Sequence, residues 1–174
     1  MSCIALHEQP TAPLHFLEGM NTFFILSAKY LFVLPLLILS IYFLSRSWST
    51  QKKILIFAGS SLFFIYLVAQ VAGYLYFDPR PFVLGHFIPL IQHAPDNGFP
   101  SDHALLVFAL ASIGAFLNLW LGIVLFAIAL IVATARVYVG LHHVIDVIGS
   151  ALISVVITSV VHLFLTYIQP KKVR

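Results

Sequence analysis

The chain has 174 residues, of which 61% are hydrophobic and only 9% are charged, and its mean hydropathy is +1.03. Such high apolar usage leaves too little polar surface to face water, which excludes a soluble globular domain and indicates an integral membrane protein. The net charge of +3 is not concentrated in a basic stripe with interleaved aromatic residues, so nucleic acid binding is not expected.

The first half of the chain predicts two membrane-spanning helices. Residues 1–21 mix polar and apolar types without lysine or arginine, which favours a surface segment or short interfacial helix over a cleaved signal peptide. Residues 22–44 form the first apolar run, long enough as a helix to cross a hydrocarbon core of about 30 Å. A short basic loop, residues 45–53, precedes the second predicted span, residues 54–77.

The second half alternates a proline-rich loop with long apolar runs. Residues 78–103 contain five prolines, which no continuous helix tolerates, and their apolar part, 82–91, is expected to lie in the interface or re-enter the membrane. Residues 104–139 would measure about 54 Å as one helix, so they are expected to form two short spans that turn near Asn118. Residues 144–168 form the last span.

These elements predict an all-α, polytopic membrane helix bundle with about five transmembrane helices in a single domain, residues 1–174. Basic residues gather at 46–53 and 171–174, and the positive-inside rule places both stretches in the cytoplasm. Counting crossings from there puts the loop 78–103 and the junction near 136–146 together on the outer face. The C-terminus is then cytoplasmic.

That junction carries Arg136, His142 and Asp146 between two apolar runs. Residues four apart share a helix face, so the Asp146 carboxylate is expected to contact His142 and to hold its Nδ1 proton, leaving Nε2 free for chemistry. Arg136 offers a fork of donors suited to a phosphate. The alternative is a buried ion pair that only joins two helices.

The loop 78–103 adds Arg80 and the sequence Ser101-Asp102-His103, which directly precedes an apolar helix. Ser101 could simply cap that helix. The functional interpretation is that the helix N-terminus, Ser101 and the two arginines form an anion site, with His103 beside it as an acid.

At this point the pattern resembles the type 2 phosphatidic acid phosphatase superfamily, in its bacitracin-resistance-type undecaprenyl diphosphate phosphatase branch. The superfamily signature has three blocks, matched here by Arg80-Pro81, by Pro100-Ser101-Asp102-His103, and by the spacing of Arg136, His142 and Asp146.

The resemblance implies that His142 attacks phosphorus to give a phosphohistidine, that Asp146 orients it, and that His103 protonates the leaving oxygen. It further implies that Arg80, Arg136, Ser101 and backbone amides near Asp102 bind the phosphate oxygens, and that the reaction needs no metal or cofactor.

Three positions depart from the signature. Gly73 stands where a lysine separated by six residues from Arg-Pro is expected, Asp102 replaces a glycine, and Ala135 replaces a serine. Lys29, about two turns inside the first span, either snorkels to the outer headgroups or replaces the missing lysine as a diphosphate ligand.

A polyprenyl lipid does not leave the bilayer, so an enzyme that acts on it has to be embedded. The resemblance implies a phosphatase of the bacterial cell membrane that dephosphorylates undecaprenyl diphosphate, and the predicted topology puts its site at the extracytoplasmic face. Phosphatidylglycerophosphate and diacylglycerol pyrophosphate are alternative substrates.

Two other classes of protein stay open at this point. One is a metal-dependent hydrolase with His103, His142, His143 and Asp146 as ligands. The other is a lipid-phosphate binder or transporter without catalysis. The oligomeric state is open.

Overall fold

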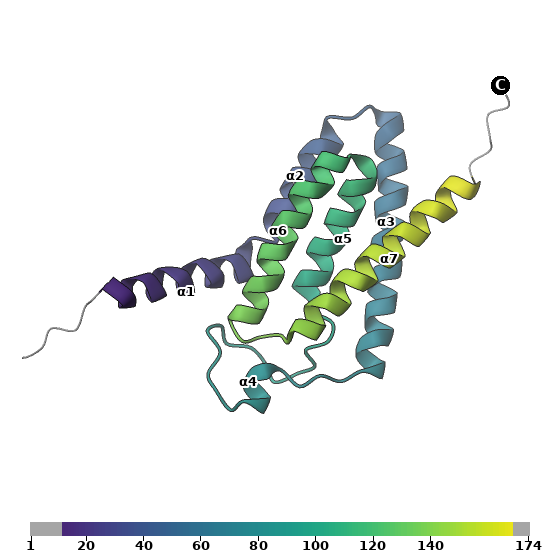
Figure 1. Ribbon diagram of the computed structural model, residues 1–174. Helices are drawn as coiled ribbons and strands as arrows, with labels where there is room; N and C mark the ends of the chain where they lie inside the picture. Colours follow the sequence, from purple (N-terminus) through teal and green to yellow (C-terminus); the bar gives the residue numbers. More distant parts are fainter. Residues whose placement is uncertain (1–11, 169–174) are drawn as a thin grey trace, which may run out of the picture.

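The computed structural model describes residues 12–168, which form seven helices and no strand (Figure 1). This confirms the predicted all-α membrane helix bundle. The helices are α1 (Ala12–Tyr30), α2 (Val33–Leu44), α3 (Trp48–Leu75), the short α4 (Pro81–Leu84), α5 (Asp102–Leu117), α6 (Leu119–Tyr138) and α7 (Val144–Ile168). The predicted single domain of 1–174 includes residues at both ends that lie outside the described part.

Helix α5 is the centre of the bundle, and α2, α3, α6 and α7 all pack against it (Figure 1). Its side chains are buried without interruption from Val107 to Gly114. Many are small, which lets neighbouring backbones approach closely where no water drives apolar groups together. At Gly122 of α6, a Cβ atom would lie 2.4 Å from Cα of Ala115 in α5, so only glycine fits there.

Hydroxyl groups fasten α7 to α5 at two levels. Ser150 shares its proton between the carbonyl oxygens of Asp146 (2.7 Å) and Ser101 (3.0 Å), and Ser154 donates to the carbonyl of Leu105 over 2.9 Å. Both serines are fully buried, where such bonds have no water competing for them. They fix the N-terminus of α5 beside the first turns of α7.

The predicted turn at Asn118 is confirmed. This residue has extended backbone between α5 and α6, and its side chain accepts a hydrogen bond of 3.0 Å from the amide of Leu121. Asn118 thus caps α6, satisfying one of the amides that a helix start leaves without an intrahelical partner.

The prediction of one continuous helix over 22–44 is wrong. The chain breaks at residues 31–32, and α1 and α2 are inclined by 49° to each other. The cause is Pro35, which has no N–H to donate to the carbonyl of Leu31 and whose ring would clash with that carbonyl in a continuous helix. Helix α1 consequently leans away from the bundle in Figure 1 and already includes residues 12–21 of the predicted interfacial segment, while 1–11 lie outside the described residues.

The number of spans also differs from the predicted five. Among the described helices, α3, α6 and α7 are long and apolar enough to cross a membrane, and the bent pair α1–α2 makes up to four. Helix α5 has only 16 residues, or about 24 Å at the α-helical rise, which is shorter than a hydrocarbon core. Its central position explains the short length, because α5 is surrounded by other helices instead of lipid.

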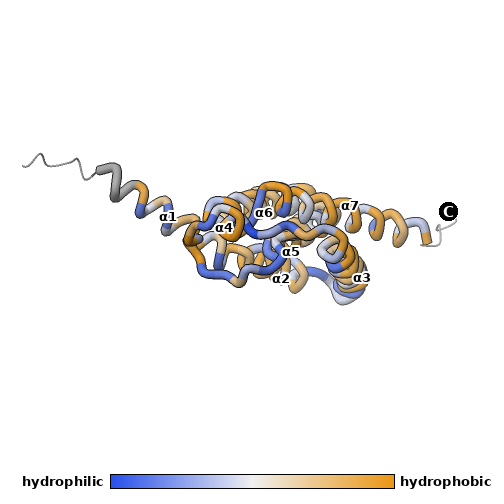
Figure 2. Tube along the Cα trace, turned by 90° about the horizontal axis from the view of Figure 1, so that it is seen from below, coloured by the Kyte–Doolittle hydropathy of each residue, from blue (hydrophilic) through white to orange (hydrophobic). Residues whose placement is uncertain are grey.

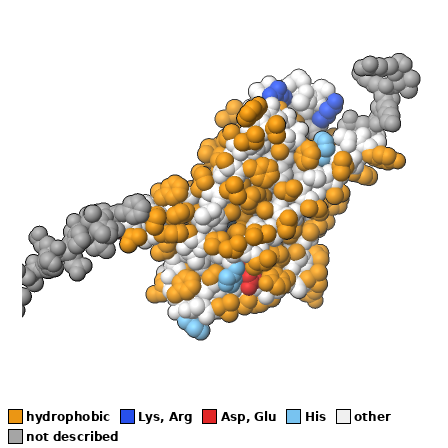
Figure 3. Space-filling view, viewed as in Figure 1, with side chains coloured by type: hydrophobic (Ala, Val, Ile, Leu, Met, Phe, Trp, Pro, Cys, Tyr) orange, Lys and Arg blue, Asp and Glu red, His pale blue; other side chains and the backbone are white. Residues whose placement is uncertain are grey.

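Polar groups concentrate at the two ends of the bundle. Seen from the loop end, hydrophilic segments lie in the loop between α3 and α5 and in the α6–α7 junction, whereas the helices are mostly apolar (Figure 2). Arg46, Lys52 and Lys53 lie at the junction of α2 and α3, at the opposite end (Figures 1 and 3). The two stretches predicted to carry the chemistry therefore lie at one end, away from this basic cluster.

We predict that Gly122→Ala lowers the melting temperature, because the added methyl group forces α5 and α6 apart at a cost of about 1 to 3 kcal/mol. Thermal unfolding in detergent, followed by circular dichroism, measures this. The control is Gly59→Ala in α3, where a Cβ atom would meet nothing within 4 Å. Its melting temperature should stay or rise, since alanine is better in a helix than glycine. Equal melting temperatures for the two variants would contradict close packing at Gly122.

Candidate active site

The loop between α3 and α5 is held closed by Asn97. The Asn97 side chain accepts hydrogen bonds from the amides of Asp78 (2.9 Å) and Phe99 (3.0 Å) and donates to the carbonyl of Gly73 over 2.8 Å. A backbone bond of 2.8 Å from Gly98 to Asp78 joins the same two arms. The loop is therefore a fixed platform that presents Arg80 from one arm and the Gly98 carbonyl from the other.

Arg80 crosses from this loop to the α6–α7 junction. Its Nη1 atom donates to the carbonyl of Leu141 over 3.0 Å and lies 3.3 Å from Nε2 of His142. Its Nε atom donates to Asp96 over 2.6 Å, and although burial raises the pKa of Asp96, Arg80 outweighs it and holds that pKa below its usual value. Arg80 is only 5% exposed, and its guanidinium is thus fixed by the loop on one side and contacts His142 on the other.

His142 is held at both ring nitrogens. Nδ1 lies 2.9 Å from the carbonyl oxygen of Gly98 and 3.3 Å from Oδ2 of Asp146, and both of these are acceptors. Nε2 lies 3.3 Å from Nη1 of Arg80 and 3.2 Å from Nη2 of Arg136, and both of these are donors. This arrangement assigns the proton to Nδ1 and a free electron pair to Nε2.

The same surroundings keep the ring neutral. Burial, with Arg136 and Arg80, lowers the pKa of His142 below its ordinary value, and this outweighs the opposing effect of Asp146. A neutral imidazole with its electron pair between two guanidinium groups can attack an electrophile that carries negative charge.

Two buried donor atoms of the predicted phosphate ligands have no protein partner in the described part of the chain. These are Oγ of Ser101, which is fully buried at the N-terminus of α5, and Nε of Arg136. Buried donors without a partner are rare, and an oxyanion is an acceptor that suits such donors as well as the free amides of a helix N-terminus. Of the predicted anion ligands, Arg80 and Arg136 thus meet at Nε2 of His142, and the role of Ser101 stays a prediction.

Asp146 takes part in a second group of contacts that we did not predict. Its Oδ2 atom accepts a hydrogen bond of 2.9 Å from the amide of His143, and the His143 ring lies 2.9 Å from Oδ2 of Asp78. Burial, and after it Asp146, raises the pKa of Asp78. The His143 ring is thus paired with Asp78, whereas the His142 ring faces the two arginines. One ligand atom from each of Asp78, His143 and Asp146 lies within 4.8 Å of the others, so these three could hold a metal ion.

His103 and Asp102 lie in the first turn of α5. His103 is half-buried, with its ring 5.0 Å from that of Phe32, and it lies within electrostatic range of Arg136. The Asp102 side chain is exposed and lies within electrostatic range of Arg136. Arg136 is therefore near enough to offset part of the repulsion between this acid and an anion.

Lys29 is not part of this group of residues. Its side chain is exposed on α1, and no hydrogen bond or ion pair joins it to another described residue. Its role as substitute for the missing lysine remains a prediction. At the lysine position itself, a Cβ atom on Gly73 would lie 3.0 Å from the carbonyl oxygen of Phe99, so the loop packs where that side chain would begin.

Sequence reasoning missed Gly98 and Asn97. A Cβ atom at Gly98 would lie 2.9 Å from Oδ2 of Asp146, so glycine is required for the loop to reach His142. The only signal for it was an Asn-Gly pair inside the proline-rich loop, which indicates a turn but not its partner.

The chain matches the family model described as "PAP2 superfamily" over residues 53–170. It is 31% identical over 160 residues to "Undecaprenyl-diphosphatase BcrC" of Bacillus subtilis, covering 90% of this chain and 80% of that protein. It is 37% identical over 125 residues to "Putative undecaprenyl-diphosphatase YbjG" of Escherichia coli, covering 69% of this chain and 60% of the relative's length.

Two solved structures share the fold. LpxE of Aquifex aeolicus superposes with a TM-score of 0.62 at 21% identity, covering 90% of this chain and 88% of the other. The first transmembrane PAP2 type phosphatidylglycerolphosphate phosphatase from Bacillus subtilis superposes with a TM-score of 0.59 at 24% identity, covering 95% and 82%. The helical arrangement is therefore the one found in these two proteins.

We predict that inorganic phosphate raises the melting temperature of the purified protein, because it satisfies the unpartnered donors in the folded state alone. At a concentration of 100 times Kd the stabilisation would be about 2.7 kcal/mol. Arg136→Ala should remove the shift, and Lys53→Ala, at the opposite end of the bundle, should retain it. An equal shift in both variants would mean that phosphate does not bind at this site.

Proposed function

The chain belongs to the PAP2 superfamily, and from this we propose that it is a membrane lipid diphosphate phosphatase that converts undecaprenyl diphosphate to undecaprenyl phosphate. The observation that carries the proposal is the contact of His142 Nε2 with two guanidinium groups, while Nδ1 of the same ring faces two acceptors. That arrangement suits nucleophilic attack on a phosphate. The lipid is proposed from relatives that bear the name undecaprenyl-diphosphatase.

In the first step, Nε2 of His142 attacks the terminal phosphorus. The bond from that phosphorus to the bridging oxygen breaks. The protonated His103 ring, an imidazolium, gives its proton to the bridging oxygen, and undecaprenyl phosphate leaves. The phosphoryl group is then on His142. Positive charge that develops on this ring is stabilised by Asp146 and by the Gly98 carbonyl, both on the Nδ1 side.

In the second step, His103, now neutral, accepts a proton from water as the water oxygen attacks the phosphohistidine. The phosphorus–nitrogen bond breaks, inorganic phosphate is released, and His142 regains its electron pair. Throughout, Arg80, Arg136, Ser101 and the amide of Asp102 would bind the equatorial oxygens, where negative charge is greatest in the transition state.

We place the site on the extracytoplasmic face of a bacterial cell membrane. The support is the separation of charge along the bundle, since Arg46, Lys52 and Lys53 lie at the end opposite the loop and basic residues favour the cytoplasm (Figure 3). The C-terminus, whose basic residues lie outside the described part, would then also be cytoplasmic.

The nucleophile prediction uses undecaprenyl diphosphate labelled in its terminal phosphate. His142→Ala should lower phosphate release by about 10³-fold or more, because no phosphoryl acceptor remains. Asp146→Asn should lower it by about 10²-fold, less than His142→Ala, because the Gly98 carbonyl still orients the ring.

Rapid quenching of the wild type should give a protein-bound phosphoryl group that is labile in acid and stable in base. Tyr74→Phe, on the exposed end of α3, is the control and should release phosphate at the wild-type rate. Turnover in His142→Ala comparable to that of the wild type would refute the mechanism.

The metal prediction concerns Asp78, His143 and Asp146. Two arginines already neutralise the phosphate in the proposed mechanism, so excess EDTA should leave the rate unchanged. A different result would assign a required metal to these three residues: EDTA abolishes the activity of the wild type, a divalent cation restores it, and the cation restores none in His143→Ala.

A further inference from the structure

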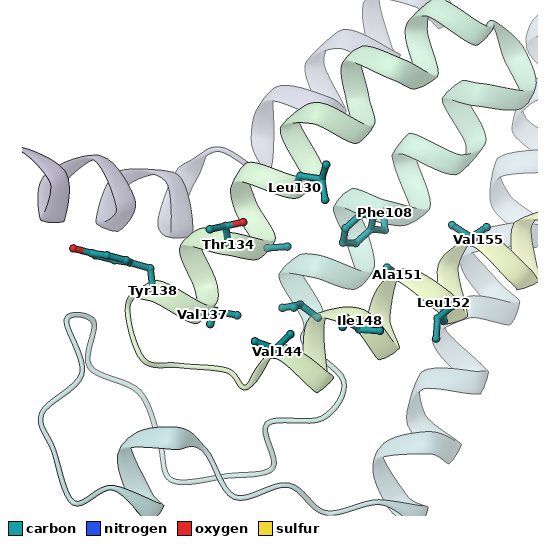
Figure 4. Close-up of a pocket in the computed structure, with 12 residues that line it drawn as sticks. Phe108, Leu130, Thr134, Val137, Tyr138, Val144, Ile148, Ala151, Leu152 and Val155 are labelled. Atoms are coloured by element: carbon teal, nitrogen blue, oxygen red, sulfur yellow. The ribbon is translucent and has the colours of Figure 1, made fainter.

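The junction between α6 and α7 is not held by direct packing of these two helices. Both pack on α5 and barely contact each other, and an open space of about 620 Å³ separates them (Figure 4). This space extends to Tyr138, the last residue of α6, and to Val144, the first residue of α7. Residues 139–143 between these helix ends include His142, so the proposed nucleophile lies on a segment that needs another support.

The loop between α3 and α5 supplies such support. Besides its contacts with His142, it donates hydrogen bonds to the backbone carbonyl oxygens of Val139 and Leu141. It also holds a side chain of the junction, because Nδ1 of His143 lies 2.9 Å from Oδ2 of Asp78. An ionised carboxylate can only accept a hydrogen bond, so Nδ1 of His143 carries the proton. The residue directly after the proposed nucleophile thus fastens the junction to the loop.

Asp78 connects this fastening to the His142 ring. The Gly98 amide donates to the carbonyl of Asp78 over 2.8 Å, and the carbonyl of Gly98 itself lies 2.9 Å from Nδ1 of His142. Asp78 therefore binds His143 through its carboxylate and Gly98 through its backbone. A displacement of Asp78 would move the Gly98 carbonyl relative to the His142 ring.

His143 also keeps Asp146 in contact with His142. The His143 amide donates over 2.9 Å to Oδ2 of Asp146, the same oxygen that lies 3.3 Å from Nδ1 of His142. One oxygen of Asp78 lies within 4.8 Å of one oxygen of Asp146, and two carboxylates this close repel each other or share a proton. The His143 ring gives Asp78 a partner of its own, which leaves Asp146 to His142.

We propose that His143 is a positioning residue for the nucleophile, which rests on the phosphoryl transfer proposed above. With Asp78 it fixes the α3–α5 loop to the α6–α7 junction. Gly98 and Asp146 then both stay at Nδ1 of His142, and Nε2 stays directed at the arginines. Neighbouring histidines thus have separate tasks, since one ring reacts and the other holds the loop that orients it.

This contact is expected to affect the rate more than the stability of the fold. The side chains of His143 and Asp78 are 34% and 13% exposed, and a partly exposed ion pair contributes little to stability. Replacing either residue by alanine should therefore change the melting temperature by no more than about 4 °C.

The kinetic test measures release of the labelled terminal phosphate in excess EDTA, so that no bound cation contributes. His143→Ala should lower kcat about 10- to 100-fold, because the nucleophile is misplaced. KM should stay within about threefold of the wild-type value, because both arginines remain. In His143→Asn the amide nitrogen can replace Nδ1 as donor, so this variant should recover most of the lost kcat. An unchanged kcat in His143→Ala, or equal losses in His143→Ala and His143→Asn, would overturn the proposal.

The matched control is His86→Asn. His86 is an exposed histidine of the same loop, and no hydrogen bond or ion pair joins it to another described residue. Its φ of 49° is one that asparagine tolerates, so kcat should equal that of the wild type. A loss of kcat in this variant as large as in His143→Ala would overturn the proposal.

A double variant tests whether Asp78 and His143 act as one unit. Asp78→Ala should lower kcat, and Asp78→Ala combined with His143→Ala should be no slower than the slower single variant. Losses that multiply would mean that the two residues act independently, which contradicts the proposal. A loss in His143→Ala as large as in His142→Ala would make His143 the phosphoryl acceptor and would also contradict it.

A measurement without turnover follows the Nδ1 proton of His142 by NMR in protein labelled with ¹⁵N-histidine. This proton should exchange with water about tenfold faster in His143→Ala, because its acceptors are no longer held in place, and at the wild-type rate in His143→Asn. Equal exchange rates in His143→Ala and the wild type would overturn the proposal. If the wild type hydrolyses no lipid diphosphate, the proposed function fails, while the exchange rates still report on positioning. The two failures are therefore distinguishable.

Discussion

The site depends on the His142 ring, which is held between acceptors at Nδ1 and donors at Nε2. The contacts at either nitrogen alone would not indicate function, since a histidine next to a carboxylate or next to an arginine is common. Together they fix the tautomer, the ring orientation and the neutral state. The contacts come from the loop, from α6 and from α7, so the ring is correctly placed only when these segments have assembled around α5.

Close helix packing makes that assembly possible. The N-terminus of α5 carries Ser101, and Ser150 ties it to the first turns of α7, where Asp146 lies. The loop reaches the same place because Asn97 closes it and Gly98 has no side chain to collide with Asp146. Small residues and hydroxyl groups in the bundle therefore determine the geometry of charged residues at its end.

The sequence predicted the helical class, the turn at Asn118 and, through a spacing of four residues, the contact between His142 and Asp146. Such features are local, although His142 lies just before α7 and contacts Asp146 across the start of that helix, not along it. The contact between Arg80 and His142, which are 62 positions apart, could be expected only from a family resemblance, since no local rule specifies it. The Asp78–His143 pair and the Gly98 carbonyl depend on the loop's path, which turn signals do not define. The break before α2 was predictable, because Pro35 lies within the apolar run and removes a bond to Leu31.

The separate attachment of α6 and α7 to α5 also has a mechanical consequence. The two outer helices share almost no interface, so changing the distance between them breaks few contacts, whereas sliding either along the central helix would disrupt close packing. The fold is compliant in one direction and stiff in the other. Lateral pressure from the surrounding lipids acts along the compliant direction, which makes bilayer composition a physical variable of this protein.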